Sequence, residues 1–266
     1  MEHYKSSGRI ARGETTSIED LRFEKYSDEQ LILFLQDKNA QTRTSSAKIL
    51  GKRKTPKSVK PLCTALKSEK CLYSKIAICN ALGDIGKPAL PDLIKLIGII
   101  GGNQHTKLPT MIFKKWNYPI PRDIVARTII KIGNPTLEDL QEILRGKNPI
   151  VIREALDAIG YISYYSSDHS SLSVLLDTLN RYEDDSIIVW KTIRALGSFP
   201  SKESINVLER FLKKSSIPTL RWEAARSLGQ IGNDRCKTIL ETITDEKNKD
   251  VCLMVEISLK KIQKQS

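Results

Sequence analysis

A short amphipathic motif recurs along this chain of 266 residues, in which an apolar stripe ends at a small residue that follows Leu or Ile. Two degenerate copies end near Ile130 and Lys260, and five copies end at a glycine: Gly51, Gly83, Gly160, Gly197 and Gly229. Successive copies lie 32, 47, 30, 37, 32 and 31 residues apart, which gives a period near 32. Such a period is typical of stacked helical hairpins, because one hairpin cannot bury its apolar faces alone.

The motif predicts the second helix of each hairpin. From Leu220 to Ile231 the apolar positions share one helical stripe, and the glycine just beyond the stripe suits a helix end that needs a positive φ. A second stretch with apolar periodicity precedes every copy, as at 59–66. The segment Ser27-Asp-Glu-Gln30 has the pattern of a capping box at a helix start. Each repeat is therefore predicted to be helix A, a turn and helix B.

The segments 149–160 and 219–232 resemble the second helix of the short HEAT-like repeat of the PBS-lyase type, which reads roughly V-R-x-x-A-x-x-A-L-G-x-I-G. A tetratricopeptide repeat would instead carry Leu-Gly early in its first helix. The resemblance covers about residues 27–264 and implies an all-α fold, a right-handed α-solenoid of about seven HEAT-like helix pairs. The family includes scaffolds, bilin lyases, DNA glycosylases and bacterial immunity proteins, so the resemblance alone leaves function open.

We expect one solenoid domain at 27–264 with an insertion at 98–121, and an N-terminal tail or short helix at 1–26. An apolar content of 40% with only 6% aromatic residues suits a long core of Leu, Ile and Ala. No stretch approaches 18 uninterrupted apolar residues, and 1–26 has no core of signal-peptide type, which favours a cytoplasmic protein that does not enter membranes. The five Cys and three His show no metal-ligand spacing, so we expect reduced thiols, no metal and no cofactor.

The net charge of +12 is distributed unevenly. Residues 38–131 carry nineteen basic and four acidic side chains, whereas residues 132–266 carry nineteen of each. Such an excess attracts nucleic acid or an acidic protein face, with an attraction that falls as salt rises. It is equally compatible with a lysine-rich solvated outer face. Both interpretations stay open at the level of sequence.

Candidate binding residues come from the face of helix B opposite its buried stripe. With the stripe centred on Ala224, steps of 100° place Trp222 and Arg226 near that face. Helix B lines the concave surface in solenoids of the family that the chain resembles, and Trp and Arg are enriched at interface hot spots. The alternative is that each Trp wedges between neighbouring B helices. The predicted partner-binding residues on helices B are Trp190, Arg194, Trp222, Arg226, Arg127 and Arg153.

The insertion at 98–121 adds an apolar and basic cluster to these candidates. Its Phe113 and Tyr118 lie close in sequence to Lys114, Lys115 and Trp116, a combination that suits an acidic partner with an apolar pocket. We therefore add the last three residues to the predicted partner-binding set. The alternative is that the aromatic residues fold back and cover a gap between repeats.

A basic residue flanks the stripe eight positions before the turn in several repeats, as at Arg43 and Arg221. In HEAT-like families a matching Arg usually forms a ladder with an acid of an adjacent inter-helix turn. Asp37 is the candidate acid for the first repeat. We expect this position to be structural.

Catalytic motifs are missing from the sequence: it has no glycine-rich phosphate loop and no G-x-S-x-G elbow. We therefore expect a non-enzymatic, protein-binding solenoid that is monomeric when free. It is loosely similar to the immunity proteins that bacteria encode beside contact-dependent toxins, which implies steric neutralisation of an acidic-surfaced toxin domain, such as a nuclease, through the concave face. The alternatives are a nucleic-acid-binding HEAT-like protein, including a DNA-glycosylase-like repair enzyme, and a general scaffold or bilin-lyase-like protein. Any binding to nucleic acid is expected to be weak.

Overall fold

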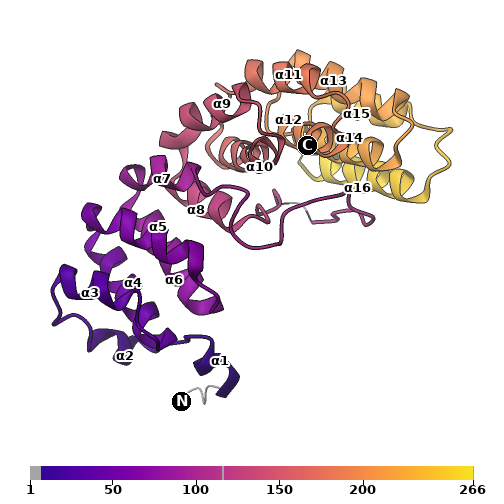
Figure 1. The fold of residues 1–266 in the computed structure, drawn as a ribbon. Coiled ribbons are helices and arrows are strands. Elements are labelled where there is room, and N and C mark those ends of the chain that lie inside the picture. The colour runs from indigo at the N-terminus through magenta and orange to yellow at the C-terminus, as the bar shows by residue number, and fades with distance from the viewer. Residues whose placement is uncertain (1–6, 116, 266) are drawn as a thin grey trace. The chain divides into compact units, whose positions relative to one another are not determined.

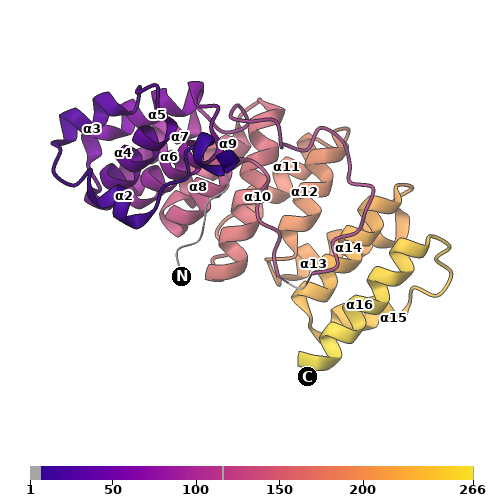
Figure 2. The ribbon, with the colours of Figure 1, turned by 90° about the horizontal axis from the view of Figure 1, so that it is seen from below.

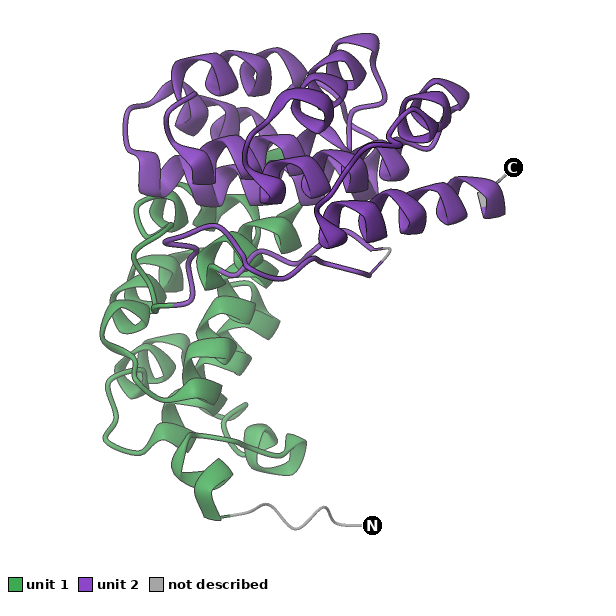
Figure 3. Ribbon diagram, turned by 90° about the vertical axis from the view of Figure 1, so that its right-hand side faces the viewer, with its two compact units in different colours: residues 1–102, 123–136 green, residues 103–122, 137–266 purple. Residues whose placement is uncertain are grey.

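The structure, a computed structural model, describes residues 7–115 and 117–265, and every regular element among them is a helix. The chain forms two compact units (Figure 3). Unit 1 comprises residues 1–102 and 123–136, and unit 2 comprises residues 103–122 and 137–266. The segment 103–122, named the insertion loop below, therefore belongs to unit 2 although it is bounded on both sides by residues of unit 1.

Unit 1 holds eight helices in its described part, together with three short 3-10 turns at 56–58, 87–89 and 134–136. Helix α3 begins at the predicted capping box, in which the Ser27 hydroxyl accepts from the Gln30 amide (3.3 Å) and the Gln30 side chain accepts from the Ser27 amide (3.0 Å). The helices are α1 (Ser7–Ala11), α2 (Ser17–Leu21), α3 (Asp28–Phe34), α4 (Ala40–Arg53), α5 (Val59–Ser68), α6 (Leu72–Ile85), α7 (Leu90–Ile94) and α8 (Ile124–Ile132).

Unit 2 contains four helix pairs and the insertion loop (Figure 1). Its A helices form one layer and its B helices form a second layer, in which α10 packs on α12, α12 on α14 and α14 on α16. The helices are α9 (Leu137–Arg145), α10 (Pro149–Ser166), α11 (Leu172–Arg181), α12 (Ser186–Leu196), α13 (Lys202–Lys214), α14 (Pro218–Ile231), α15 (Asp234–Glu241) and α16 (Lys249–Gln265).

The prediction of an all-α solenoid of about seven helix pairs is confirmed. Three pairs, α3/α4, α5/α6 and α7/α8, lie in unit 1, and four pairs, α9/α10, α11/α12, α13/α14 and α15/α16, lie in unit 2. The buried core consists mainly of Leu, Ile, Val and Ala side chains. The apolar stripe of each helix therefore packs against neighbouring helices. One solenoid domain over 27–264 stays a prediction.

The glycines of the motif serve helix packing, whereas the positive φ expected at the glycine just beyond the stripe of 220–231 is confirmed at Gly232. The positive-φ glycines at these helix ends are Gly86, Gly133 and Gly232, which follow α6, α8 and α14 directly. At Gly51, by contrast, an added Cβ would lie 2.6 Å from the Ala81 Cα of the next B helix. These glycines therefore let neighbouring B helices approach closely, a requirement that the sequence of one repeat does not reveal.

Replacement of Gly51 by alanine is expected to lower the free energy of unfolding by about 1–3 kcal/mol, because α4 and α6 must move apart. Alanine favours an isolated helix by up to about 1 kcal/mol, so a loss of stability would isolate the steric effect. Urea unfolding measures the change. The control is Gly8→Ala in α1, where an added Cβ meets nothing within 4 Å. A Gly51→Ala variant as stable as the parent would contradict the close approach.

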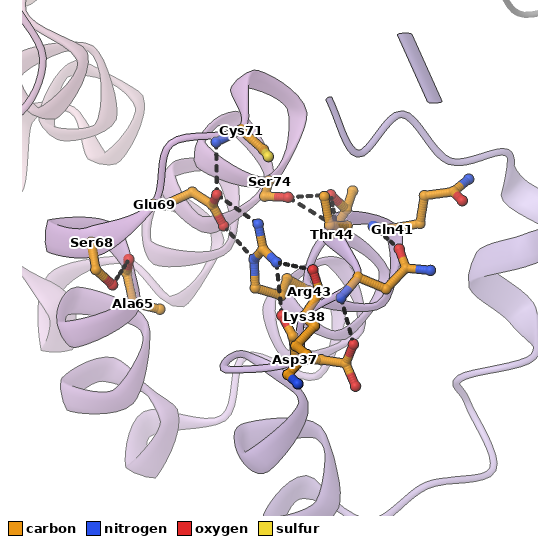
Figure 4. A network of polar contacts seen from close by, with 12 residues as sticks. Asp37, Lys38, Gln41, Arg43, Thr44, Ala65, Ser68, Glu69, Cys71 and Ser74 are labelled. Atoms are coloured by element: carbon orange, nitrogen blue, oxygen red, sulfur yellow. Dashed lines mark hydrogen bonds and ion pairs between the residues drawn. The ribbon is translucent and has the colours of Figure 1, made fainter. Parts of the chain in front are cut away.

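A ladder of Arg and acid pairs joins successive repeats (Figure 4). The Arg43 guanidinium donates to both carboxylate oxygens of Glu69 (2.7 and 2.9 Å) and to the carbonyl of Asp37 (2.7 Å). Although burial raises the pKa of Glu69, hydrogen bonds from Arg43 and from the Cys71 amide hold it below its usual value. The expected structural role of Arg43 is confirmed, but its acid is Glu69, because the guanidinium bridges to the next repeat and uses only the main chain of Asp37.

The ladder recurs in unit 2. Arg221 pairs with Glu246 (2.7 Å) and also donates to the carbonyl of Ser215 (2.9 Å), which repeats the arrangement around Arg43. Arg153, whose role in partner binding stays a prediction, pairs with Asp185 (2.6 Å) directly before α12. We therefore assign Arg153 to the ladder. The acid always precedes the next helix B, so the pairing depends on the repeat that follows.

Candidate protein-binding surfaces

The two Trp and Arg pairs predicted as an open groove floor are buried in unit 2. The exposed fraction is 0% for Trp190, 3% for Trp222 and 6% for both Arg194 and Arg226. The interpretation in which Trp190 and Trp222 lie exposed on the groove floor of the free protein is therefore wrong. The alternative, in which the indoles wedge between helices, describes Trp190, whose Nε1 on α12 donates to Glu223 Oε2 on α14 (2.7 Å).

These side chains belong to a buried network of charges on three B helices. Lys191 Nζ lies 2.8 Å from Glu154 Oε1 and 2.9 Å from Asp157 Oδ2, both on α10. On α14, Glu223 receives one guanidinium from each side: Arg194 Nη2 lies 2.9 Å from its Oε2 and Arg226 Nη1 lies 3.2 Å from its Oε1. Three cations thus face three carboxylates.

Charge compensation within this network is unequal. Burial lowers the pKa of Arg194, but the carboxylates of Glu223 and Asp157 outweigh it and raise that pKa above its usual value. Burial also lowers the pKa of Arg226, and Glu223 does not restore it, because the like charge of Arg194 opposes. Burial alone would raise the pKa of Glu223, but the two guanidiniums hold this pKa below its usual value. Arg226 is therefore the less compensated of the two guanidiniums.

A sequence signal for the network was missed. The position six before the motif glycine holds Glu154, Lys191 and Glu223 in three successive repeats, so that opposite charges alternate from one helix B to the next. The alternation becomes visible when the same position is compared between successive repeats. A helical wheel of a single helix B does not show it. It predicts ion pairs between adjacent helices.

The insertion loop covers the network. Figure 2 shows the loop running along the B helices of unit 2, across α12 toward α14. The His105 ring meets the Trp190 ring edge-on with centroids 4.8 Å apart, and burial lowers the pKa of His105 to about 4, against the opposing effect of the Asp157 carboxylate. The Pro109 carbonyl accepts from Thr219 Oγ1 (3.3 Å), and the Asn117 carbonyl accepts from Arg226 Nη2 (3.2 Å). The loop thus binds the face through its own main chain.

Tyr118 anchors the returning arm of the loop. Its side chain is fully buried, and its ring lies 5.7 Å from that of Tyr164 on α10. A Cβ at Gly160 would collide with the Tyr118 hydroxyl, so this glycine makes room for the phenol. The insertion therefore folds back over the B helices, and its Lys114 and Lys115 remain exposed. The third loop candidate, Trp116, lies outside the described residues.

In unit 1, residues near the N-terminus cover the start of the B-helix layer. Lys48 on α4 pairs with Asp20 on α2 (2.7 Å) and donates to Thr15 (2.7 Å). Thr44 is buried and shares a hydrogen bond with Ser74 (2.9 Å). The first repeat therefore offers little open surface on this side.

The α6/α8 face remains accessible within unit 1. A depression lies between these helices, and its lining includes Ile76, Asn80, Ile124, Arg127 and Lys131. Ile76 is 40% exposed, and Leu72, one turn earlier on α6, is 45% exposed. We name this depression and its surroundings the α6/α8 face. Arg127, of the predicted partner-binding set, thus lies on an accessible face.

The two units differ in charge as well as in coverage. Unit 1 contains twenty basic and twelve acidic side chains. Unit 2 contains twenty-three basic and nineteen acidic side chains, and the insertion loop, with four basic and no acidic residues, accounts for its whole excess. The loop and the α6/α8 face are two positions at which the described part of the chain offers basic side chains next to apolar ones.

Within the described part of the chain, no three His, Cys, Asp or Glu side chains gather in a group that could hold a metal ion. None of the helices described in residues 7–115 and 117–265 has the length and apolarity needed to cross a bilayer. The five cysteines are all free; three of them, Cys63, Cys79 and Cys236, are buried, as expected, but Cys252 is exposed.

Several solved structures are similar to the chain. Human deoxyhypusine hydroxylase is 15% identical, with 89% of this chain and 84% of that chain covered and a TM-score of 0.41. A designed armadillo repeat protein is 14% identical, with coverages of 89% and 100% and a TM-score of 0.40. The complex of CpcE and CpcF of phycocyanin lyase from Nostoc is 16% identical, with coverages of 90% and 95% and a TM-score of 0.36. No curated protein sequence matches the chain significantly.

The family comparison gives a direct assignment. The family model for HEAT repeats matches residues 29–98, which span α3 to α7, and residues 172–260, which begin with α11 and end within α16. Because these two segments make up more than half of the sequence, the chain belongs to the HEAT-repeat family.

Proposed function

We propose that the chain is a non-enzymatic protein-binding HEAT-repeat protein that holds an acidic protein partner on the α6/α8 face. The observation that carries this proposal is the accessible depression between these helices, where exposed Ile76 lies beside Arg127 and Lys131. Apolar area supplies affinity in such an interface, and the cations select an acidic surface and accelerate association. The designed armadillo repeat proteins, similar in fold, include one solved in complex with a (KR)4 peptide, which is a binder of opposite charge preference.

The specific form of the proposal is an immunity protein. In this form the partner is a toxin domain, for example a nuclease, whose acidic active-site surroundings meet the α6/α8 face and are blocked sterically. The loose similarity to immunity proteins of contact-dependent toxin systems supports this form, and the product of the adjacent open reading frame is the first partner to test. A toxin gene at that position would support it, whereas a cluster of DNA-repair genes would favour the nucleic-acid alternative.

The double substitution Ile76→Glu with Arg127→Glu replaces an apolar side chain by an acid and reverses one charge. It is expected to weaken partner binding by about 2 kcal/mol or more, roughly thirtyfold in Kd, because it removes an apolar contact and repels an acidic surface. Stability should change little, since both side chains are accessible. Isothermal titration with the purified partner measures the affinity. The control is Lys60→Glu on α5, an exposed lysine outside the α6/α8 face. An equal loss of partner affinity in the double variant and in Lys60→Glu would indicate a general effect of charge.

A nucleic-acid partner is the competing interpretation, because the basic excess of unit 1 also attracts phosphates. We expect only weak, sequence-blind binding to a short DNA or RNA duplex, with affinity falling steeply as salt rises. Submicromolar binding at physiological salt that depends on the structure of the duplex would overturn the protein-partner proposal.

A further inference from the structure

The N-terminal segment, residues 7–26, covers α4 and reaches the first turn of α6. The carbonyl of Arg12 accepts a hydrogen bond from the Tyr73 amide (3.1 Å), and the guanidinium of Arg12 lies 6.0 Å from the centre of the Tyr73 ring. Ile76, one turn after Leu72 on α6, is 40% exposed. The α6/α8 face therefore begins next to a surface that the chain itself covers.

The element that covers α4 is a short acidic helix. Helix α2 packs on α4, and Asp20 of α2 accepts hydrogen bonds from Lys48 Nζ (2.7 Å) and from the Ser45 hydroxyl (2.6 Å). Lys48 lies three residues before the end of the motif at Gly51, and exposed Arg127 lies three residues before the corresponding Ile130. Unit 1 thus shows what a cation at this position of the repeat holds: a carboxylate on a helix.

Two rows of side chains form the α6/α8 face, one row on each helix. Within a row, successive residues are three or four positions apart, so that each row runs along one side of its helix. The row on α6 extends for about 12 Å, at about 1.5 Å per residue. The rows are Leu72, Ile76 and Asn80 on α6, and Ile124, Arg127 and Lys131 on α8.

A helix suits these rows better than an extended segment does. An extended segment brings main-chain amide and carbonyl groups that need partners, and the exposed side chains of Leu72 and Ile76 offer no hydrogen bond. A helix satisfies its main-chain groups internally and places an apolar stripe in the groove between two packed helices. Acidic side chains beside that stripe then meet the cations of α8.

Lys131 supplies a second cation one turn after Arg127. Its Nζ pairs with Asp84 (2.7 Å), and the side chains of both residues are more than 40% exposed. Ion pairs at such exposed positions contribute little, because water screens them. A carboxylate of the partner therefore replaces or shares this contact at little cost.

We propose that an amphipathic acidic helix is the partner element that binds the α6/α8 face. Its apolar stripe covers Leu72 and Ile76. A carboxylate beside the stripe pairs with Arg127, as Asp20 of α2 pairs with Lys48. The proposal rests on the proposed function and specifies the element through which the acidic partner binds.

Three synthetic peptides of about 18 residues test the proposal on the full chain. The first carries Leu at positions i, i+3, i+4 and i+7 of a helix, with Glu, Gln and Ala elsewhere. In the second a central Ala is replaced by Pro, which breaks the helix and keeps the charge, and in the third Lys replaces every Glu. Fluorescence anisotropy of the labelled peptides measures affinity. The first peptide is expected to bind at least tenfold more tightly than either of the others.

Substitutions in the protein locate the bound peptide. Ile76→Ser and Arg127→Gln should each weaken binding of the first peptide at least fivefold. The matched controls are Leu33→Ser on α3, where the side chain is 72% exposed, and Lys60→Gln on α5, because both lie in unit 1 outside the α6/α8 face. Neither control should change the affinity. Circular dichroism checks that all four variants are folded.

The possible results separate this proposal from the proposed function. Equal affinity for the first peptide and its proline variant, or no binding of either, would overturn the helical element, while titration with the purified partner still tests the face. Equal affinity for the acidic and the lysine peptide would contradict both. Self-association of the parent chain that Ile76→Ser abolishes, measured by sedimentation velocity, would assign the face to a second copy and overturn the helix proposal.

Discussion

Replacement of Trp190 by alanine is expected to lower the free energy of unfolding by about 3–5 kcal/mol, because a fully buried indole is removed from between α12 and α14. The guanidinium of Arg194 lies 4.0 Å above the ring and also loses this contact. For a chain of this length the change corresponds to a drop of about 6–20 °C in the Tm of the transition to which unit 2 contributes. Thermal unfolding followed by circular dichroism measures it.

Two further variants separate the loss of the indole hydrogen bond and the loss of buried aromatic volume from the general effect of a substitution to alanine. Trp190→Phe keeps an aromatic ring but removes the donor to Glu223, so it should cost about 1–3 kcal/mol. Ile150→Ala, at an exposed position at the start of α10, should be nearly neutral. Trp190→Ala should also free His105 and expose the insertion loop to trypsin at Lys107. An unchanged melting temperature would mean that the indole is not part of the core and would restore its predicted role in partner binding.

The helix pairs could be predicted from the sequence because their signals are local. A stripe at 3.6-residue spacing, repeated near every 32 residues, determines helix type and order without knowledge of distant contacts. The capping box at Ser27 is equally local, since both of its hydrogen bonds form within four residues. These features were therefore accessible to periodicity and cap patterns alone.

Two features could not be assigned from the sequence of one repeat, because they depend on the neighbouring repeat: the packing role of the motif glycines and the acid that pairs with Arg43. A glycine near a helix end suits either a positive φ or a close approach, and only the contact of Gly51 with Ala81 decides between them. The acid for Arg43 likewise comes from Glu69, 26 residues later, rather than from nearby Asp37. A motif read within one repeat does not contain this information.

The prediction of an open groove on helices B is wrong because a segment distant in sequence covers this face. A helical wheel identifies a face, but it cannot show that a segment about 85 residues earlier covers that face, as His105 covers Trp190. The apolar residues of the insertion are compatible, at the level of sequence, with an external partner and with folding back onto the repeats. Only the packing of Tyr118 into the space at Gly160 distinguishes the two.

Replacement of Glu223 by alanine is expected to cost about 3–5 kcal/mol in the free energy of unfolding, because it leaves the guanidiniums of Arg194 and Arg226 buried without their shared carboxylate. It also removes the acceptor of the Trp190 indole. The matched control is Glu209→Ala on α13, whose pair with Lys213 is partly exposed and should contribute at most about 1 kcal/mol. Urea unfolding at pH 7 compares the three proteins.

The pH dependence of the Glu223 effect has a defined sign. The two guanidiniums hold the folded-state pKa of Glu223 below its ordinary value of 4.5, so the unfolded chain takes up this proton first as the pH falls. The stabilisation by its charge is thus fully present above about pH 4.5 and is lost as the pH falls through the lower folded-state pKa.

Glu223→Gln, which keeps the shape without the charge, should be less stable than the parent at pH 7, and the difference should shrink below pH 4.5. Subtracting the two unfolding curves cancels, to first order, the pH dependence that the parent and the variant share. A difference that stays constant from pH 7 to pH 3 would show that the carboxylate of Glu223 does not stabilise the network by its charge.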